Sequence, residues 1–250
     1  MTEDLSVLTR PASPPDQVLA YGADIDQVAE LRFGGEGAVK LPLLVVVHGG
    51  FWRQQYDRKH AASMAAAFAA LGWTVVTVEY RRIPGNPDAS LQDVVRAVQV
   101  LPALPALIAQ HNGKVIMIGH SAGGHLALYT AGKYLLPALH GVLALAPVAD
   151  LRLAHALRLG NGAVRDFLGV EAIERPGADP KLLGTPPVLV TIVHGVEDAV
   201  VPQAISESYL AAYPKTRLVR LQGSGHFALI DPLSTAWPTV VAELQRLCEQ

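Results

Sequence analysis

The stretch VIMIGHSAGGHLAL, residues 115–128, decides the fold. Apolar residues at 115–118 are typical of a buried strand, and the residues from 122 onward are typical of a helix that begins at once. Between them lies the pattern Gly-x-Ser-x-Gly, whose glycines allow a tight turn and a close approach of helix to strand. Such a turn lifts the hydroxyl of Ser121 out at the carboxyl end of the strand. The stretch therefore predicts a nucleophilic serine.

The chain on both sides of this stretch alternates strand and helix. Short apolar runs predict strands at 43–48, 74–79, 115–119, 142–146, 188–193 and 217–221. The segments between and after them predict helices at 57–71, 88–101, 122–136, 203–213 and 234–248. Two alternating segments, 17–22 and 27–34, predict an antiparallel pair before the first of these strands. We therefore expect an α/β fold with about eight strands, a mostly parallel twisted sheet with helices on both faces.

The segments that interrupt this alternation of strands and helices indicate the domain organisation. We expect a single domain over residues 1–250, with a proline-rich, loose N-terminal arm over 1–16. Residues 147–187 are too long for a plain turn and contain short helical patterns. They predict a small cap-like insertion beside the carboxyl ends of the strands, where α/β proteins bind their ligands.

The composition excludes several function classes. The 20 basic and 22 acidic residues nearly cancel, so no nucleic-acid partner is indicated. Cys248 is the single cysteine, which rules out an intramolecular disulfide. The first residues lack the apolar core of a signal peptide, and no apolar stretch is long enough to span a membrane. We expect a cytoplasmic protein with no membrane partner, and both monomer and homodimer remain open.

A serine hydroxyl is a poor nucleophile unless a base takes its proton. His226 lies in a glycine-rich loop before the last helix, and such a loop can place an imidazole over the serine. The acid that orients the histidine should follow a strand between serine and histidine. Asp198 is the preferred acid, and Glu197 and Asp150 are the alternatives. Ser121, Asp198 and His226 then follow one another in the chain order of α/β-hydrolases.

Four motifs carry a resemblance to a known superfamily: HGGFW (48–52), GHSAGGHLAL (119–128), HGVEDAVVP (194–202) and GSGHFALIDP (223–232). With them, residues from about 17 to 245 resemble the α/β-hydrolase superfamily, and within it the small esterase and kynurenine formamidase group. The resemblance implies an α/β-hydrolase fold with a small cap. It also implies a serine hydrolase that cleaves a small carboxylic ester or an aryl formamide through an acyl-enzyme.

In such hydrolases the loop after the third strand helps to bind the oxyanion of the tetrahedral intermediate. The resemblance therefore assigns an oxyanion hole to Gly50 or Phe51 together with Ala122, with Gly49 allowing the backbone to approach. The N–H of Ala122 also lies at a helix start, where unpaired donors favour an anion. His48 is interpreted as a structural support for this loop.

Four residues are predicted to line a substrate pocket: Phe51, Trp52, Tyr80 and His120. Large aromatic side chains also dominate protein cores, and for Trp52 packing is the favoured interpretation. His125, one turn into the helix after the serine, is expected to be structural.

No cofactor is expected from the motifs of this chain. A G-x-G-x-x-G pattern after the first strand, a phosphate-binding loop and an H-E-x-x-H pattern are all absent from the sequence. Histidines 48, 120, 194 and 226 follow separate strands, and the triad accounts for the last of them without a metal. His194 resembles the loop-stabilising histidine of the family. We therefore predict no metal.

Two other function classes stay open. A small peptidase of the prolyl oligopeptidase type would share the serine turn. A binding protein with an inactive site would share the fold, since fold alone does not establish activity. Proteins of the second kind usually lack a member of the triad, whereas serine, acid and histidine candidates are all present here.

Overall fold

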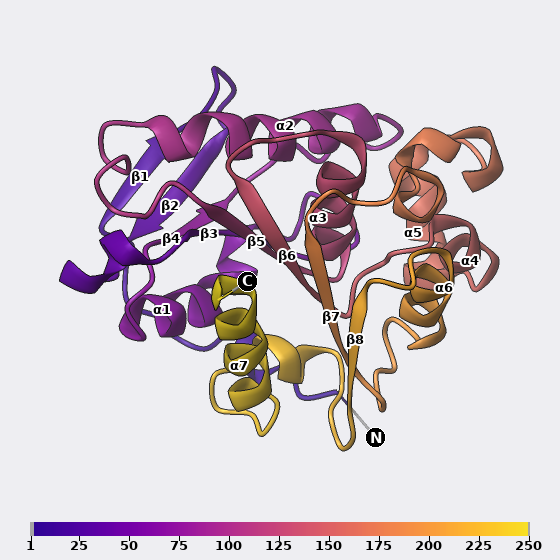
Figure 1. Ribbon diagram of the computed structural model, residues 1–250. Coiled ribbons are helices and arrows are strands. Elements are labelled where there is room, and N and C mark those ends of the chain that lie inside the picture. Colours follow the sequence, from indigo (N-terminus) through magenta and orange to yellow (C-terminus); the bar gives the residue numbers. More distant parts are fainter. Residues whose placement is uncertain (1–2, 250) are drawn as a thin grey trace.

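One eight-stranded sheet organises the protein, for which a computed structural model describes residues 3–249 (Figure 1). Its strands lie in the order β1-β2-β4-β3-β5-β6-β7-β8. They are β1 (Gln17–Ala20), β2 (Val28–Arg32), β3 (Leu43–Val47), β4 (Val75–Val78), β5 (Val115–His120), β6 (Leu139–Leu145), β7 (Leu189–Gly195) and β8 (Arg217–Leu221). Pairs β1–β2 and β2–β4 are antiparallel, and every other pair is parallel. The predicted sheet, mostly parallel with an antiparallel start, is confirmed.

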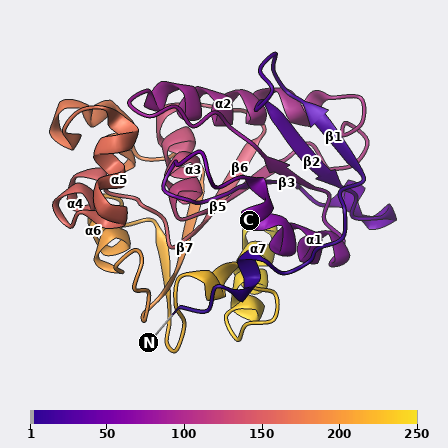
Figure 2. The same ribbon diagram turned by 180° about the vertical axis from the view of Figure 1, so that it is seen from behind.

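Helices cover both faces of this sheet and make three layers (Figures 1 and 2). The α-helices of the described chain are α1 (Ala62–Ala70), α2 (Pro87–Val100), α3 (Ala122–Lys133), α4 (Leu151–Ala156), α5 (Leu159–Leu168), α6 (Ala204–Ala212) and α7 (Trp237–Glu249). Buried residues of α2, α3 and α6 share one apolar cluster, and those of α1 and α7 share the other. None of the helices in residues 3–249 is long and apolar enough to cross a membrane.

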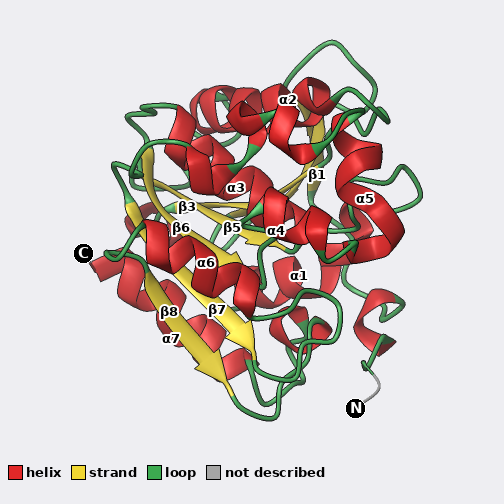
Figure 3. Ribbon diagram, turned by 90° about the vertical axis from the view of Figure 1, so that its right-hand side faces the viewer, coloured by secondary structure: helices red, strands yellow, loops and turns green. Residues whose placement is uncertain are grey.

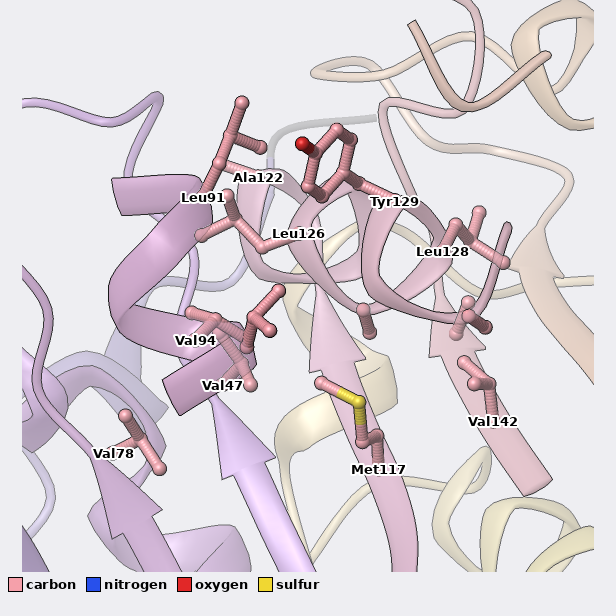
Figure 4. Close-up of a cluster of buried hydrophobic side chains, with 14 of the residues drawn as sticks. Val47, Val78, Leu91, Val94, Met117, Ala122, Leu126, Leu128, Tyr129 and Val142 are labelled. Carbon is pink, nitrogen blue, oxygen red and sulfur yellow. The ribbon is translucent and has the colours of Figure 1, made fainter. Parts of the chain in front are cut away.

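The central strand β3 shows why the sheet is covered twice. All five of its residues are buried, and successive side chains point to opposite faces. Val45 and Val47 belong to the cluster of α2 and α3, whereas Leu44 and Val46 belong to that of α1 and α7. Figure 4 shows Val47 between side chains of α2 and α3. A strand that is buried on both faces has no polar side, which is why its sequence is a continuous apolar run.

Two elements illustrate how the observed ends differ from the predicted ones. The helix expected over 57–71 begins as a 3₁₀-helix, Arg58–Ala61, because the Asp57 carboxylate accepts a hydrogen bond from the Lys59 N–H at 2.9 Å. The strand expected over 142–146 begins earlier, at Leu139. His140 and Gly141 interrupt its apolar pattern, so the first residues of β6 could not be predicted from the sequence.

The described part of the N-terminal arm contacts the fold at a few residues, although most of its residues are exposed or half-buried. Ser6–Leu8 forms a 3₁₀-helix, and Val7 is only 3% exposed in the cluster of α1 and α7. The Arg10 guanidinium donates to both carboxylate oxygens of Asp231, one at 2.9 Å. The burial of Val7 and the ion pair between Arg10 and Asp231 therefore attach the arm to the fold. The prolines in its sequence do not indicate either contact.

The segment 147–187 holds α4, α5 and three short 3₁₀-helices (Figure 3). Three successive residues of α5, from Gly160 to Gly162, have left-handed backbone angles. Asn161 tolerates this conformation better than most non-glycine residues. The chain therefore turns sharply beside the loop after β3, where the Gly160 carbonyl accepts a hydrogen bond from Arg53 Nη2 at 2.6 Å.

Candidate active site

Ser121 forms the turn between β5 and α3. Its φ of 56° and ψ of −117° are angles that a non-glycine residue adopts only where the surroundings impose them. The Ser121 N–H donates to Leu145 O at 2.9 Å, and Ser121 O accepts from the N–H of His125 at 3.1 Å and of Val148 at 3.2 Å. These bonds hold the hydroxyl where β5 ends. The residue is 2% exposed.

The two glycines that flank Ser121 are required by backbone contacts. A Cβ atom at Gly119 would lie 2.3 Å from Gly123 O, and one at Gly123 would lie 2.1 Å from Val47 O. Both obstacles are main-chain atoms of packed elements and cannot rotate away. Helix α3 therefore sits close to β3 and β5 because these positions lack side chains.

A Gly123→Ala variant is expected to be destabilised by about 3 kcal/mol, because the new methyl group overlaps the β3 backbone. That loss corresponds to a fall in Tm of about 6–12 °C for a chain of this size. Gly37→Ala is the matched control, since a Cβ there meets nothing within 4 Å. Thermal unfolding followed by circular dichroism measures both. Equal Tm values for the two variants would contradict the steric explanation.

Asp198 and His226 are brought together by the loops that follow β7 and β8. His226 Nδ1–H donates to Asp198 Oδ2 at 2.7 Å. The other carboxylate oxygen accepts from the N–H groups of Val200 at 2.8 Å and Val201 at 2.7 Å. Burial would raise the pKa of Asp198, but hydrogen bonds from His194 and His226 lower that pKa well below its usual range. Asp198 is therefore ionised and holds the histidine with its Nε2 atom turned away from the carboxylate.

The two alternative acids have other partners in the described chain. Glu197 accepts a hydrogen bond from the Ser224 N–H at 2.9 Å. Asp150 caps α4 by accepting from the Leu153 N–H at 2.9 Å, and its second oxygen accepts from Lys181 Nζ at 2.9 Å. Within residues 3–249, Asp198 is thus the only one of the three candidate acids that is hydrogen-bonded to His226.

His120, which directly precedes Ser121 in the chain, contacts His226. The rings of His120 and His226 are 4.4 Å apart, and His120 Nε2–H donates to His226 O at 3.2 Å. In the described chain no hydrogen bond joins Ser121 Oγ to the His226 imidazole. Such bonds are often long or poorly aligned before a substrate is bound.

The loop after β3 packs directly against the serine turn. A Cβ atom at Gly49 would lie 3.0 Å from both His120 O and Ser121 Cβ. The next residues, Gly50, Phe51 and Trp52, have positive φ values of 107°, 52° and 56°. No acceptor in residues 3–249 is hydrogen-bonded to the N–H of Gly50, Phe51 or Ala122. The N–H groups of all three predicted oxyanion donors therefore have no acceptor within the described residues, and each belongs to the loop after β3 or to the serine turn.

His48 fixes the orientation of the peptide between Gly49 and Gly50. His48 Nδ1–H donates to Gly49 O at 2.8 Å, and His48 O accepts from the Tyr80 hydroxyl at 3.0 Å. In a trans peptide the N–H points opposite to the C=O, so the Gly50 N–H points away from the His48 ring. His48 thus supports this loop on the side opposite the Gly50 N–H.

A buried ion cluster holds His48 in turn. Glu79 Oε1 contacts His48 Nε2 at 3.1 Å and also accepts from the Arg82 guanidinium. Burial would raise the pKa of Glu79, but hydrogen bonding to His48 and the charges of His48 and Arg82 lower it to about 2. The carboxylate is therefore ionised at neutral pH.

Phe51 and Trp52 line a cavity of about 680 Å³ between this loop, the loop before α2 and α5. Trp52 is 5% exposed and stacks on Phe167 with ring centroids 4.4 Å apart, so it packs and lines the cavity at once. The Gly85 N–H donates to Asp166 O at 2.8 Å. This bond fastens the loop before α2 to the insertion.

Tyr80 and His120 are the other two residues that the sequence predicts to line a substrate pocket. Both are fully buried, and neither lines this cavity. The Tyr80 hydroxyl is bonded to His48 O, and both ring nitrogens of His120 are hydrogen-bonded. Their positions next to strand ends suggested contact with a substrate, but each side chain turns into the protein and supports a neighbouring loop.

Solved esterase structures have the same architecture as this chain. Esterase B from Lactobacillus rhamnosis has a TM-score of 0.78 and 17% sequence identity, over 98% of this chain and 91% of that one. The BD-FAE family model matches residues 33–140, which include the loop after β3 and the serine turn. The chain has the α/β-hydrolase fold.

Two curated relatives from Mycobacterium tuberculosis match parts of this chain. LipM, named a probable carboxylic ester hydrolase, is 36% identical over 95 residues, covering 36% of this chain and 21% of the relative. Esterase LipQ is 29% identical over 197 residues, covering 69% of this chain and 46% of LipQ. The chain thus spans less than half the length of these relatives.

Two residues of the site region carried no signal in the sequence. Glu3 accepts hydrogen bonds from the N–H groups of Ala199 and His226, and His60 lies 3.1 Å from His120. Neither belongs to a motif, and each reaches the candidate site from a distant part of the chain. No group of three or more histidine, cysteine or acidic side chains in residues 3–249 is arranged to hold a metal ion.

Proposed function

We propose that this protein hydrolyses small carboxylic esters with Ser121 as nucleophile. The observation that carries the proposal is the 2.7 Å hydrogen bond between His226 and Asp198, in loops that meet the serine turn. The ester hydrolases among its relatives support the same reaction class. In this proposal Ser121 Oγ attacks the carbonyl carbon while His226 Nε2 takes its proton.

The tetrahedral intermediate places a negative charge on the former carbonyl oxygen. We assign its stabilisation to the N–H groups of Gly50 and Ala122, because His48 holds the Gly49 carbonyl and so orients the Gly50 N–H. Phe51 is the alternative donor. His226 then gives its proton to the leaving oxygen, and water attacks the acyl-enzyme with His226 as base. The proton finally returns to Ser121, and the carboxylic acid leaves.

An aryl formamide is the second candidate substrate. It is favoured by one observation, the aromatic wall that Phe51, Trp52 and Phe167 give to the 680 Å³ cavity. The polar groups beside this wall include Gln54, Gln55, Arg53, Arg165 and Asp166. Such a cavity suits a flat ring with a polar substituent.

The experiment that tests this proposal compares kcat/KM for p-nitrophenyl esters of graded acyl length with that for N-formylkynurenine. Turnover of short esters with none of the formamide would favour the esterase, and a marked preference for the formamide would favour the formamidase. An aminoacyl arylamide in the same panel tests the peptidase class. No turnover of any substrate, together with no labelling by a fluorophosphonate probe, would indicate an inactive binding protein.

A further inference from the structure

His226 is held at three separate atoms by three distant parts of the chain. Asp198 accepts from its ring Nδ1–H at 2.7 Å. Its backbone N–H donates to the two carboxylate oxygens of Glu3 at 3.0 and 2.8 Å. Its backbone carbonyl accepts from His120 Nε2–H at 3.2 Å. Ring Nε2 is thus the one polar atom of His226 for which the described chain shows no hydrogen-bond partner.

The bond from His120 fixes the tautomers of two histidines. A carbonyl oxygen can only accept, so His120 Nε2 carries a proton and the neutral ring leaves Nδ1 as an acceptor. His60 Nε2, which lies 3.1 Å from that Nδ1, must therefore be the donor. Burial, with the charges of other histidines, lowers the pKa of His60 to about 3 and that of His120 well below its usual value. Both rings are neutral at the pH at which an esterase is assayed.

Glu3 joins the two loops that carry the acid and the base. Besides His226, its carboxylate accepts from the Ala199 N–H at 3.1 Å. A Cβ atom at Gly225 would lie 2.4 Å from a Glu3 oxygen, so the glycine makes room for this carboxylate. Figures 1 and 2 both show the N-terminal end of the chain beside the loops after β7 and β8.

We infer that Glu3 and the His60–His120 pair are positioning residues for His226. Glu3 holds the backbone N–H of His226 and the histidine pair holds its backbone carbonyl, so that the ring is presented to Ser121 in one orientation. The inference rests on the proposed role of His226 as general base. A displacement of about 1 Å of a catalytic group costs up to about 100-fold in rate, which sets the scale of the expected effects.

The histidine pair is tested with His60→Phe and His60→Gln. Phenylalanine keeps a ring but removes the donor, so His120 can change tautomer and release the His226 carbonyl. We expect kcat for an acetyl ester to fall about 10-fold at unchanged KM. The Gln variant should recover most of the activity, because its side-chain N–H₂ can donate to His120 Nδ1.

The control for this test is His111→Phe, since His111 is also buried and bonded to backbone groups, but distant from the site in the described fold. It should keep wild-type kcat. A His60→Phe variant with wild-type kcat, or a Gln variant as slow as the Phe variant, would overturn the role of the pair.

Glu3 is tested with Glu3→Ala in the presence and absence of acetate. We expect kcat to fall about 10-fold, and added acetate to restore it by occupying the place of the missing carboxylate. Asp4→Ala is the control, because Asp4 accepts only from the Ser6 N–H in the described chain. Wild-type kcat in Glu3→Ala, or a loss that acetate does not restore, would overturn the role of Glu3.

Failure of this inference differs from failure of the proposed function. If Ser121→Ala abolishes turnover while His60→Phe and Glu3→Ala keep wild-type kcat, only the positioning roles are excluded. If Ser121→Ala keeps turnover, the proposed function itself fails.

Discussion

Replacing Ser121 with alanine is expected to lower kcat for p-nitrophenyl acetate on the order of 10⁶-fold, to a residual rate set by binding and the oxyanion donors alone. The substitution removes a single oxygen atom. The backbone bonds that impose the turn, including that from Ser121 N–H to Leu145 O, do not depend on the side chain. The variant should therefore fold, and the loss should be in kcat rather than in Tm.

Two measurements decide this prediction. Ester turnover by purified Ser121→Ala is compared with that of the wild type, at matched circular dichroism spectra. A fluorophosphonate probe is then reacted with both proteins, and the adduct is located by mass spectrometry. Undiminished turnover by the variant, or an adduct on another residue, would show that Ser121 is not the nucleophile.

Replacing Asp198 with asparagine is expected to lower kcat about 10⁴-fold. The asparagine oxygen can still accept from the N–H groups of Val200 and Val201, so the loop keeps its shape. Its N–H₂ group would face His226, which then presents Nδ1 as an acceptor and carries its proton on Nε2. In that tautomer His226 cannot take a proton from Ser121.

Glu197→Gln is the matched control for this variant. Glu197 is the neighbouring carboxylate and accepts from the Ser224 N–H, a bond that glutamine can preserve. Its kcat should stay within about 10-fold of the wild type, because the group touches neither His226 nor Ser121. Steady-state kinetics of both variants tests the assignment. A larger loss in Glu197→Gln than in Asp198→Asn would assign the acid to Glu197.

The part of the fold that could be predicted from the sequence is the part encoded locally. β3 and β5 are continuous apolar runs because both of their faces are buried, and the turn at Ser121 carries its two glycines within five residues. His226 could be named from the sequence because its loop follows the last strand. Short-range sequence patterns and the order of the residues in the chain were sufficient to predict each of these features.

The remainder depends on contacts between distant residues. Glu3 and His226 are 223 positions apart, and His60 and His120 are 60 apart, so neither pair leaves a local pattern. For Tyr80 the sequence shows that the residue follows a strand, but not that its side chain is fully buried and bonded to His48 O. The positions of these side chains are determined by tertiary packing. The periodicity of apolar residues in the sequence gives no information about it.

The close approach of Gly85 and Gly169 has an evolutionary consequence. A Cβ atom at Gly169 would lie 2.8 Å from the Gly85 Cα, so two of the three segments that line the cavity meet through bare backbone. Under the proposed function this cavity binds the substrate. Mutations elsewhere in these two segments should then alter which molecules are accepted, while Ser121, Asp198 and His226, which lie on other loops, are inherited unchanged. Divergence of substrate range in descendants of this chain should accumulate in the cavity walls, with both glycines retained.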